Sequence, residues 1–149
     1  MLTVATAKNI LGIIEPVKLP DLGVDFAYAK IDTGAYSGAI HCESITPMRS
    51  ELGRKYLQVV PVDATHRPVD IYRYRVTYTT SSTGHRIRRY VIDTFILING
   101  KGYTISIGLA TRDNMKVKVL IGRRFIRKNK LLVDVTKNQD LDDDGGKKL

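Results

Sequence analysis

The chain has 149 residues, 43% of them hydrophobic, and a formal net charge of +9. This is the length of one ordinary domain, and no apolar run approaches the roughly 20 residues that a membrane-spanning helix needs. The single cysteine excludes an internal disulfide, and the charge favours an acidic partner such as nucleic acid, a membrane surface or an acidic peptide.

The first third of the chain alternates apolar and polar residues, a pattern that predicts short β-strands. The central one covers residues 24–31 and carries Asp32 at its far end. The other elements expected here are a strand over residues 9–15 that Pro16 ends, a turn over residues 19–23 and a short strand over residues 38–42.

The middle of the chain predicts a long hairpin. Residues 71–79 alternate most clearly, with a stripe of tyrosines on one face, and residues 86–98 form the second arm. Residues 80–85 between them are small and polar and include a glycine, as expected of a hairpin tip. Before this hairpin we expect a loop over residues 48–55 and a strand over residues 56–62.

The last third continues the same way. Asn99-Gly100 is a strong signal for a two-residue hairpin turn, and the strand that follows alternates up to Leu109. The remaining expected elements are a strand over residues 116–121, a turn of helix over residues 123–127 and a strand over residues 131–135. We therefore expect an all-β domain over residues 9–136, between an N-terminal extension over residues 1–8 and a polar, acidic tail over residues 137–149.

Basic residues cluster in two segments, residues 67–89 and residues 112–130. Runs of charge are often only a solvated face of a domain. The alternative is that these residues attract an acidic ligand, and the sequence leaves both interpretations open.

The stretch from Ala29 to Ala35 contains Asp32-Thr33-Gly34 directly after a predicted strand. Aspartic proteases present their catalytic carboxylate on such a turn, where the hydroxyl can brace the backbone and glycine lets amide donors approach the carboxylate. Aspartate and glycine are also common in ordinary turns, so this tripeptide alone does not define a catalyst.

Aspartic proteolysis requires two carboxylates about 3 Å apart that share one proton. This chain holds one Asp-Thr-Gly, because the partial matches that begin at Asp93 and Asp134 both lack the glycine. If Asp32 is catalytic, the second carboxylate comes from another copy of the chain, and the enzyme is a two-fold symmetric homodimer.

Two other features fit this interpretation. The hairpin tip over residues 80–85 could serve as a flap that closes over an extended peptide. The run over residues 117–123 matches the apolar-apolar-glycine segment that packs beneath the catalytic loop of retroviral-type proteases.

The chain as a whole resembles the bacterial retropepsin-like aspartic endopeptidase family known as ATP-dependent zinc proteases, a domain also encoded near glutamate-adding ribosomal-protein ligases. The segments that carry the resemblance are Glu15 and residues 19–23, 29–35, 39–41, 82–89, 111–115 and 120–124. It implies a closed acid-protease barrel with one short C-terminal helix, acting as a homodimeric peptidase.

The candidate site residues form three groups. Asp32, Thr33 and Gly34 are the catalytic candidates. The candidates for substrate binding are Ala35, Tyr36, Ser82, Thr83, Gly84 and Arg89. The candidates for structural support of the site are His41, Arg112, Asp113, Ile121, Gly122 and Arg123. The basic flap arm makes acidic or glutamate-rich peptides the expected substrate class.

No cofactor and no metal is expected, whatever the family's label. The sequence has neither a phosphate-binding loop ending in Gly-Lys-Ser/Thr nor a His-Glu-x-x-His motif, and its three histidines are far apart. The amino terminus lacks the order of a signal peptide, so a cytoplasmic location without membrane attachment is expected. The rival hypothesis is a non-catalytic barrel that binds an acidic protein tail or RNA through its basic face.

Overall fold

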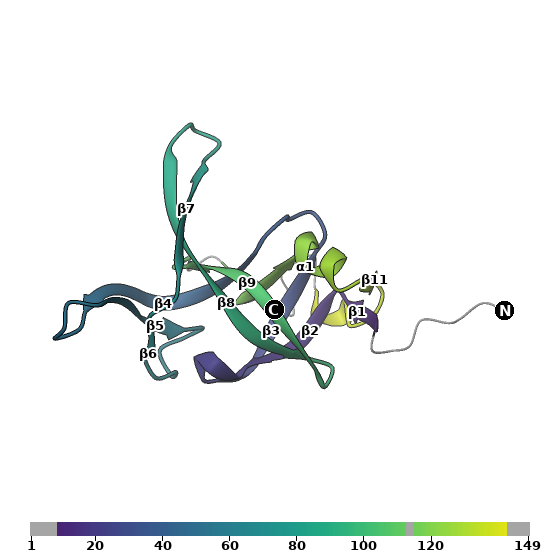
Figure 1. Ribbon diagram of the computed structural model, residues 1–149. Helices are drawn as coiled ribbons and strands as arrows, with labels where there is room; N and C mark the ends of the chain where they lie inside the picture. Colours follow the sequence, from purple (N-terminus) through teal and green to yellow (C-terminus); the bar gives the residue numbers. More distant parts are fainter. Residues whose placement is uncertain (1–8, 113–114, 143–149) are drawn as a thin grey trace.

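The computed structural model describes residues 9–112 and 115–142, and it is a β-barrel with one short helix (Figure 1). The elements are β1 (Ile10–Gly12), β2 (Ile14–Leu19), η2 (Pro20–Leu22), β3 (Val24–Asp32), β4 (Gly38–Arg49), β5 (Lys55–Pro61), β6 (Val69–Ile71), β7 (Arg75–Thr80), β8 (Arg86–Ile98), β9 (Lys101–Ala110), β10 (Val119–Gly122), α1 (Arg123–Lys128), β11 (Leu132–Asp134) and η3 (Gln139–Leu141). Among the described helices, none is long and apolar enough to cross a membrane.

Six strands close the barrel in the order β10-β3-β2-β8-β9-β4, and pairing of β10 with β4 completes the circle. The alternating residues of β9 supply part of the core, from Tyr103 to Leu109. The expected all-β acid-protease barrel with one short helix after its last barrel strand is confirmed. It leaves no open edge within the ring of six strands.

The turn between β8 and β9 follows the sequence prediction. Asn99 and Gly100 both have positive φ angles, +53° and +76°, and β8 pairs with β9 from Ile98 and Lys101 onward. Two consecutive residues with positive φ define the hairpin turn whose twist matches that of the flanking strands.

Cys42 lies in the core and is fully buried. Burial raises the pKa of its thiol to about 12, so the thiol stays protonated at neutral pH. Because the thiolate is the reactive species, this cysteine is a packing residue of the barrel.

The prediction that Pro16 ends the first strand is wrong. Residues 10–12 and residues 14–19 form separate strands, and Pro16 lies inside β2 opposite Tyr28 of β3. The pairing of β2 with β8 begins only at Val17, so the proline has a strand neighbour on one side. The missing amide hydrogen of a proline is tolerated at such an edge position.

The loop predicted over residues 48–55 is also wrong in extent. β4 continues to Arg49, β5 begins at Lys55, and only residues 50–54 form the turn. The Ser50 amide donates to the Arg54 carbonyl over 2.9 Å, which closes the hairpin. The last four residues of β4 are all exposed, so they lack the alternation that marks a half-buried strand.

The strand predicted over residues 71–79 is divided in two. β6 ends at Ile71 and pairs with β5, whereas β7 begins at Arg75 and pairs with β8. The tyrosine stripe follows this change of partner, because the Tyr72 ring stacks on Tyr56 at 4.8 Å and the Tyr74 ring meets Tyr90 edge-on at 5.7 Å.

β7 and the first half of β8 form a hairpin that projects from the barrel (Figure 1). Every residue of β7 is exposed. At the tip, the Ser81 amide donates to the His85 carbonyl over 2.7 Å, and Gly84 has a φ of +83° that suits glycine. The flap-shaped hairpin expected from the sequence is therefore present.

The amino-terminal strands are tied to the segment after β11 through Glu15. This carboxylate is buried and accepts hydrogen bonds from the Gly12 amide at 2.7 Å and the Lys137 ammonium at 3.2 Å. The side-chain amide of Asn138 donates to the Ile14 carbonyl over 2.7 Å. Lys137 and Asn138, which the sequence places in the tail, thus contact the barrel.

Candidate active site

Asp32 lies at the end of β3, where three strands meet. β10 lies between β3 and β4, parallel to β3 with Gly122 opposite Asp32, and antiparallel to β4. The loop over residues 33–37, which joins β3 to β4, therefore passes over the end of β10. This crossing places the candidate carboxylate next to the glycine that ends the apolar run.

Gly122 allows this close approach. A Cβ atom at this position would lie 2.6 Å from the Tyr36 carbonyl oxygen and 2.7 Å from its carbon. Its backbone is extended, with a φ of −91°, so space is the reason that glycine is needed. The loop that carries Asp32 thus rests directly on the backbone of β10.

Hydrogen bonds hold the Asp32 loop to itself and to α1. The Gly34 amide donates to the Asp32 carboxylate oxygen Oδ1 over 2.9 Å, which orients the carboxylate. From the helix side, the Arg123 amide donates to the Ala35 carbonyl over 2.8 Å, and the Arg123 guanidinium donates to the Gly34 carbonyl over 3.1 Å. The carboxylate therefore stands on a turn that is anchored from both sides.

Asp32 is half-buried, while Thr33 and Gly34 are exposed. A carboxylate oriented by a backbone amide and open to solvent can act as a general base toward water. One such carboxylate lacks the second carboxylate with which it would share the proton of an acid-protease site. The arrangement in one chain is thus half of that kind of site.

The two partial matches to Asp-Thr-Gly are engaged elsewhere. Asp93 accepts a hydrogen bond from the Arg75 guanidinium over 2.8 Å and another from the Ser106 hydroxyl, and these bonds hold the pKa of the Asp93 carboxyl below its usual range. Asp134 accepts from the Thr136 hydroxyl and amide, which likewise lowers its pKa. Both carboxylates are parts of local structure.

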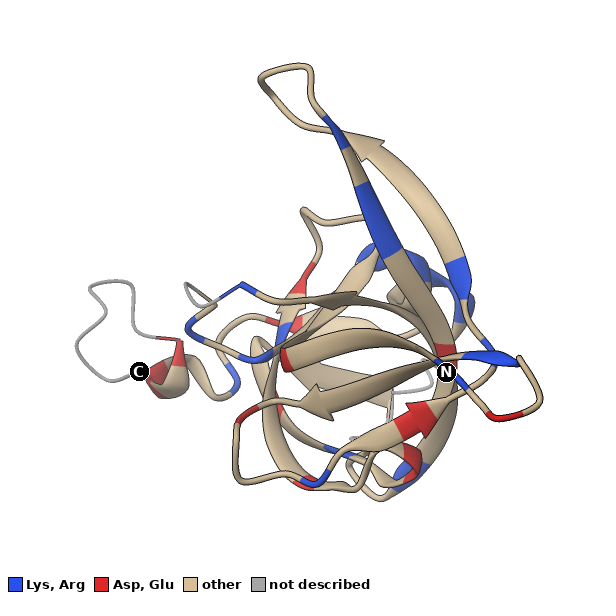
Figure 2. Cartoon of the chain, turned by 90° about the vertical axis from the view of Figure 1, so that its left-hand side faces the viewer, with Lys and Arg blue, Asp and Glu red and all other residues tan. Residues whose placement is uncertain are grey.

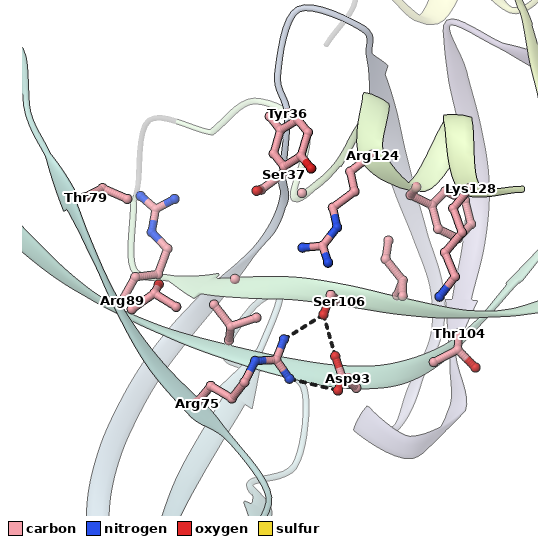
Figure 3. Close-up of a pocket in the computed structure, with 16 residues that line it drawn as sticks. Tyr36, Ser37, Arg75, Thr79, Arg89, Asp93, Thr104, Ser106, Arg124 and Lys128 are labelled. Atoms are coloured by element: carbon pink, nitrogen blue, oxygen red, sulfur yellow. Dashed lines mark hydrogen bonds and ion pairs between the residues drawn. The ribbon is translucent and has the colours of Figure 1, made fainter.

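A cavity of about 690 Å³ lies beside the Asp32 loop (Figure 3). The inner face of the β7–β8 hairpin forms one wall, α1 forms another, and residues 36–38 of the loop complete it. Arg75, Asp93 and Ser106 form a hydrogen-bonded group on one side, with Arg75 to Ser106 at 2.7 Å. A groove next to a candidate catalytic turn and beneath a hairpin can accommodate an extended chain.

Four cations line this cavity, and they come from both basic clusters of the sequence. Arg75 and Arg89 lie on the hairpin, and Arg124 and Lys128 extend from α1 toward the opposite wall (Figure 3). Figure 2 shows lysine and arginine positions along the projecting hairpin. The clusters are therefore more than a dispersed solvated face, because the fold gathers part of each around one cavity.

The structure brings several candidate site residues together and leaves others apart. The first group surrounds the candidate catalytic turn: Asp32, Thr33, Gly34, Ala35, Tyr36, Ile121, Gly122 and Arg123. Within it, Ile121 is fully buried opposite Ile31, and the Arg123 guanidinium lies 5.5 Å from the Tyr36 ring. Ile121 and Arg123 thus contact the elements that carry the candidate turn.

The flap candidates lie at the end of the projecting hairpin. Ser82, Thr83 and Gly84 are exposed at the tip, which stands away from the barrel in Figure 1. Arg89, farther down the same hairpin, lines the cavity together with Tyr36. In this arrangement Arg89 is the flap candidate placed at the cavity.

The other supporting candidates lie where the first residues of β4 pair with the end of β9. His41 is buried, its backbone amide donates to the Lys118 carbonyl over 2.7 Å, and its Nδ1 atom has no partner among the described residues. Arg112 is exposed just after β9. Asp113 lies outside the described residues.

Sequence reasoning did not predict the charged and hydrogen-bonding residues Arg75, Asp93, Ser106, Arg124 and Lys128 as part of the site. The two basic clusters were the available signal for three of them. Nothing in the sequence showed that residues more than 30 positions apart share one cavity, because that follows from the pairing of β8 with β9 and the position of α1.

The described residues do not offer a metal site. No three His, Cys, Asp or Glu side chains in this part of the chain gather where they could hold an ion. His41 is in the core, and the His66 ring is within 3.0 Å of Asp63, a carboxylate it shares with Thr65. The donor set needed for zinc hydrolysis does not match this arrangement.

A closed β-barrel that carries an Asp-Thr-Gly turn above the apolar strand ending in Gly122 belongs to the retropepsin-like class of folds. A family model described as RimB-like, retropepsin-like aspartic endopeptidase RimB, matches residues 10–141. The chain belongs to this family, and the resemblance drawn from its motifs is confirmed.

Curated relatives carry a different name. The chain is 30% identical over 143 residues to a probable alpha-L-glutamate ligase of Shewanella pealeana, covering 93% of this chain and 31% of that protein. It is 28% identical to a probable alpha-L-glutamate ligase of Parasynechococcus marenigrum, with coverage of 93% and 30%. The chain thus spans less than a third of the length of these relatives.

A solved structure of similar fold is protein Lpg0085, of unknown function, from Legionella pneumophila. It superposes with a TM-score of 0.62 at 28% sequence identity, covering 87% of this chain and 95% of that one.

Proposed function

We propose that this chain is an aspartic endopeptidase that acts as a homodimer, with Asp32 from each subunit forming the catalytic pair. The observation that carries the proposal is the half-site: Asp32 is oriented by the Gly34 amide at 2.9 Å on a turn anchored to β10 and α1. Membership of the retropepsin-like endopeptidase family supports it.

The chemistry follows from two carboxylates that share one proton. The ionised carboxylate takes a proton from water, whose oxygen attacks the scissile carbonyl carbon, while the protonated carboxyl donates to the carbonyl oxygen. Transfer of a proton to the amide nitrogen then releases the amine and the carboxylic acid. Thr33 and Gly34 hold the turn, and the β7–β8 hairpin closes over the peptide and excludes water.

The proposal requires self-association. At micromolar concentration, sedimentation equilibrium is expected to give twice the mass of one chain, and peptide cleavage is expected to rise with the square of the chain concentration below the dissociation constant. A species that stays monomeric at concentrations where cleavage is measured, with a rate linear in concentration, would show that one chain suffices and the dimeric mechanism is wrong.

Acidic or glutamate-rich peptides are the proposed substrate class. Arg75, Arg89, Arg124 and Lys128 surround the cavity beside the catalytic turn, and Asp93, its acidic lining residue, is already paired with Arg75. Carboxylate side chains of a peptide would meet the remaining cations. The glutamate ligase names of the curated relatives fit a role near glutamate-containing proteins.

Removing one of these cations is expected to weaken binding of acidic peptides selectively. Arg124→Gln should raise KM for a glutamate-containing peptide roughly fivefold to tenfold, with little change for its glutamine analogue. Arg127→Gln is the matched control, because Arg127 lies on the same helix but does not line the cavity. Equal effects of the two variants, or of one variant on both peptides, would contradict this specificity.

The cavity also supports a second candidate function, a non-catalytic module that binds an acidic protein tail. Its four cations would serve such a ligand without hydrolysis. Asp32→Asn distinguishes the two functions. A non-catalytic module would bind the acidic tail equally well with this substitution, and binding would not be followed by release of peptide fragments.

A further inference from the structure

The projecting hairpin has a second face that the proposed peptidase does not use. Arg75, Thr77 and Thr79 of β7 and Arg89, Val91 and Asp93 of β8 line the cavity. Alternate residues of a strand point to opposite faces, so the outer face carries Val76 and Tyr78 of β7, Tyr74 just before it, and Arg86, Arg88 and Tyr90 of β8. We call this set the outer face.

Four residues of the outer face, Tyr74, Val76, Arg88 and Tyr90, form one wall of a groove. Tyr78 and Arg86 continue the same face toward the tip of the hairpin. The end of the β4–β5 hairpin forms the other wall with Pro47, Met48, Arg49 and Lys55, and the groove encloses about 380 Å³. Three of its lining residues are cationic, Arg49, Lys55 and Arg88, and no lining residue in the described chain is acidic. A negatively charged ligand is therefore the chemistry that this groove accommodates.

Aromatic rings alternate with these cations. The Arg88 guanidinium lies 5.0 Å from the Tyr90 ring and donates to its hydroxyl, and the Arg86 guanidinium lies 3.9 Å from the Tyr78 ring. Tyr78 retains 52% of its exposed area and Val76 retains 42%. The surface thus offers flat π-faces and guanidinium planes side by side, open to solvent.

The combination of cations and exposed aromatic rings favours one class of polyanionic ligand over the others. An acidic peptide would use the cations but has no flat groups to cover the rings. A single-stranded nucleic acid has both, because its phosphates pair with Arg and Lys while its bases stack on tyrosine and arginine planes. A rigid duplex cannot present its bases to these rings.

We propose that the groove between the outer face and the β4–β5 hairpin is a binding site for single-stranded nucleic acid. It lies on the side of the hairpin opposite the cavity, so it can be occupied together with the peptidase site. RNA and DNA single strands share this chemistry, and a contact with the 2′-hydroxyl would distinguish them.

The test is fluorescence anisotropy with labelled 12-nucleotide oligouridylate and oligothymidylate and the unmodified chain. Binding is expected at low salt, and the logarithm of affinity should fall with the logarithm of salt concentration with a slope of about −2, as for three cations on a single strand. A duplex of the same length should bind more weakly. Tighter binding of oligouridylate would identify RNA as the ligand. Equal binding of the two oligonucleotides would mean that the site accepts single-stranded RNA and single-stranded DNA alike.

Two variants and their controls locate the site. Arg88→Gln should weaken binding severalfold and make the salt slope shallower by about 0.7. Arg89→Gln removes the same charge one residue away on the inner face, and it should leave the affinity unchanged within twofold. Tyr78→Ala should weaken binding roughly tenfold, whereas Tyr78→Phe, which keeps the ring, should bind as the wild type does.

Several results would overturn the proposal. These are no binding at low salt, equal losses for Arg88→Gln and Arg89→Gln, wild-type affinity of Tyr78→Ala, or displacement of the oligonucleotide by oligoglutamate at equal charge concentration. Circular dichroism melting of each variant confirms that the barrel remains folded. All three substituted side chains lie on the projecting hairpin and outside the core. A loss of oligonucleotide binding can therefore be told apart from unfolding of the barrel.

Discussion

Asp32→Asn is expected to reduce peptide hydrolysis on the order of a thousandfold or more, because the asparagine amide can neither ionise nor take a proton from water. The side-chain oxygen of asparagine can still accept the Gly34 amide bond that Asp32 Oδ1 accepts now. The turn and the barrel should therefore remain as they are, and the melting temperature should change little. Cleavage of a quenched fluorescent peptide at matched protein concentration measures the loss.

Asp25→Asn is the matched control, since Asp25 lies on the same strand but is exposed on the outside of the barrel. It should retain wild-type activity. Unchanged cleavage by Asp32→Asn would contradict the catalytic assignment.

A mixing experiment tests the pair itself. If each site needs one Asp32 from each subunit, a ninefold excess of the inactive variant should remove most of the wild-type activity, because most active chains then pair with inactive ones. Activity that depends only on the amount of wild-type chain would contradict the shared site while leaving the role of Asp32 intact.

Gly122→Ala is expected to lower the free energy of unfolding by about 2–4 kcal/mol. The new Cβ would lie 2.6–2.8 Å from backbone atoms of Tyr36 and Ser37, and backbone that is held by the Arg123 and Arg124 amides cannot move aside cheaply. Urea unfolding followed by circular dichroism measures the change. Peptide cleavage should fall as well, since the displaced loop carries Asp32.

Gly108→Ala provides the comparison. Its Cβ would meet the side chain of Arg89 at 3.0 Å, and a long flexible side chain can shift by a few tenths of an ångström. The loss should stay below about 1 kcal/mol. Equal losses for the two variants would mean that the contact between β10 and the loop is not the reason for glycine at position 122.

Together, the two glycine variants and the aspartate variant distinguish loss of the reacting carboxylate from distortion of the loop that carries it. Asp32→Asn removes the reacting group from an intact turn, whereas Gly122→Ala moves an intact group. A dimeric peptidase should lose activity in both cases but stability only in the second. Oligonucleotide affinity of the groove on the outer face should be unchanged in both variants, because neither residue lines that groove.

Local sequence patterns predicted much of the fold. The alternation of Tyr103, Ile105, Ile107 and Leu109 predicted a strand whose alternate side chains enter the core, and all four are buried. Asn99-Gly100 predicted the hairpin turn because these residues accept positive φ angles. These features depend on neighbours within a few residues, so a sequence can specify them directly.

Strand boundaries were less predictable where a segment changes its pairing partner or where a strand extends beyond the hydrophobic core. The strand expected over residues 71–79 breaks because Ile71 pairs with β5 and Arg75 with β8, although the tyrosine alternation runs through both. The β4–β5 hairpin is longer than expected because the outer end of β4 is exposed on both faces and so shows no alternation of buried and exposed residues. In both places backbone pairing with another segment decides the structure, and hydrophobic alternation does not report it.

The sequence by itself determined the all-β class, the turn at Asp32 and the need for a second copy if that turn is catalytic. These conclusions rest on residue types and order alone. Only the tertiary structure decided that Gly122 lies beneath the Asp32 loop at backbone contact distance, and that Arg75, Arg89, Arg124 and Lys128 share one cavity. The physical reason is that both arrangements depend on contacts between segments far apart in the chain, which strand pairing across the closed barrel brings together.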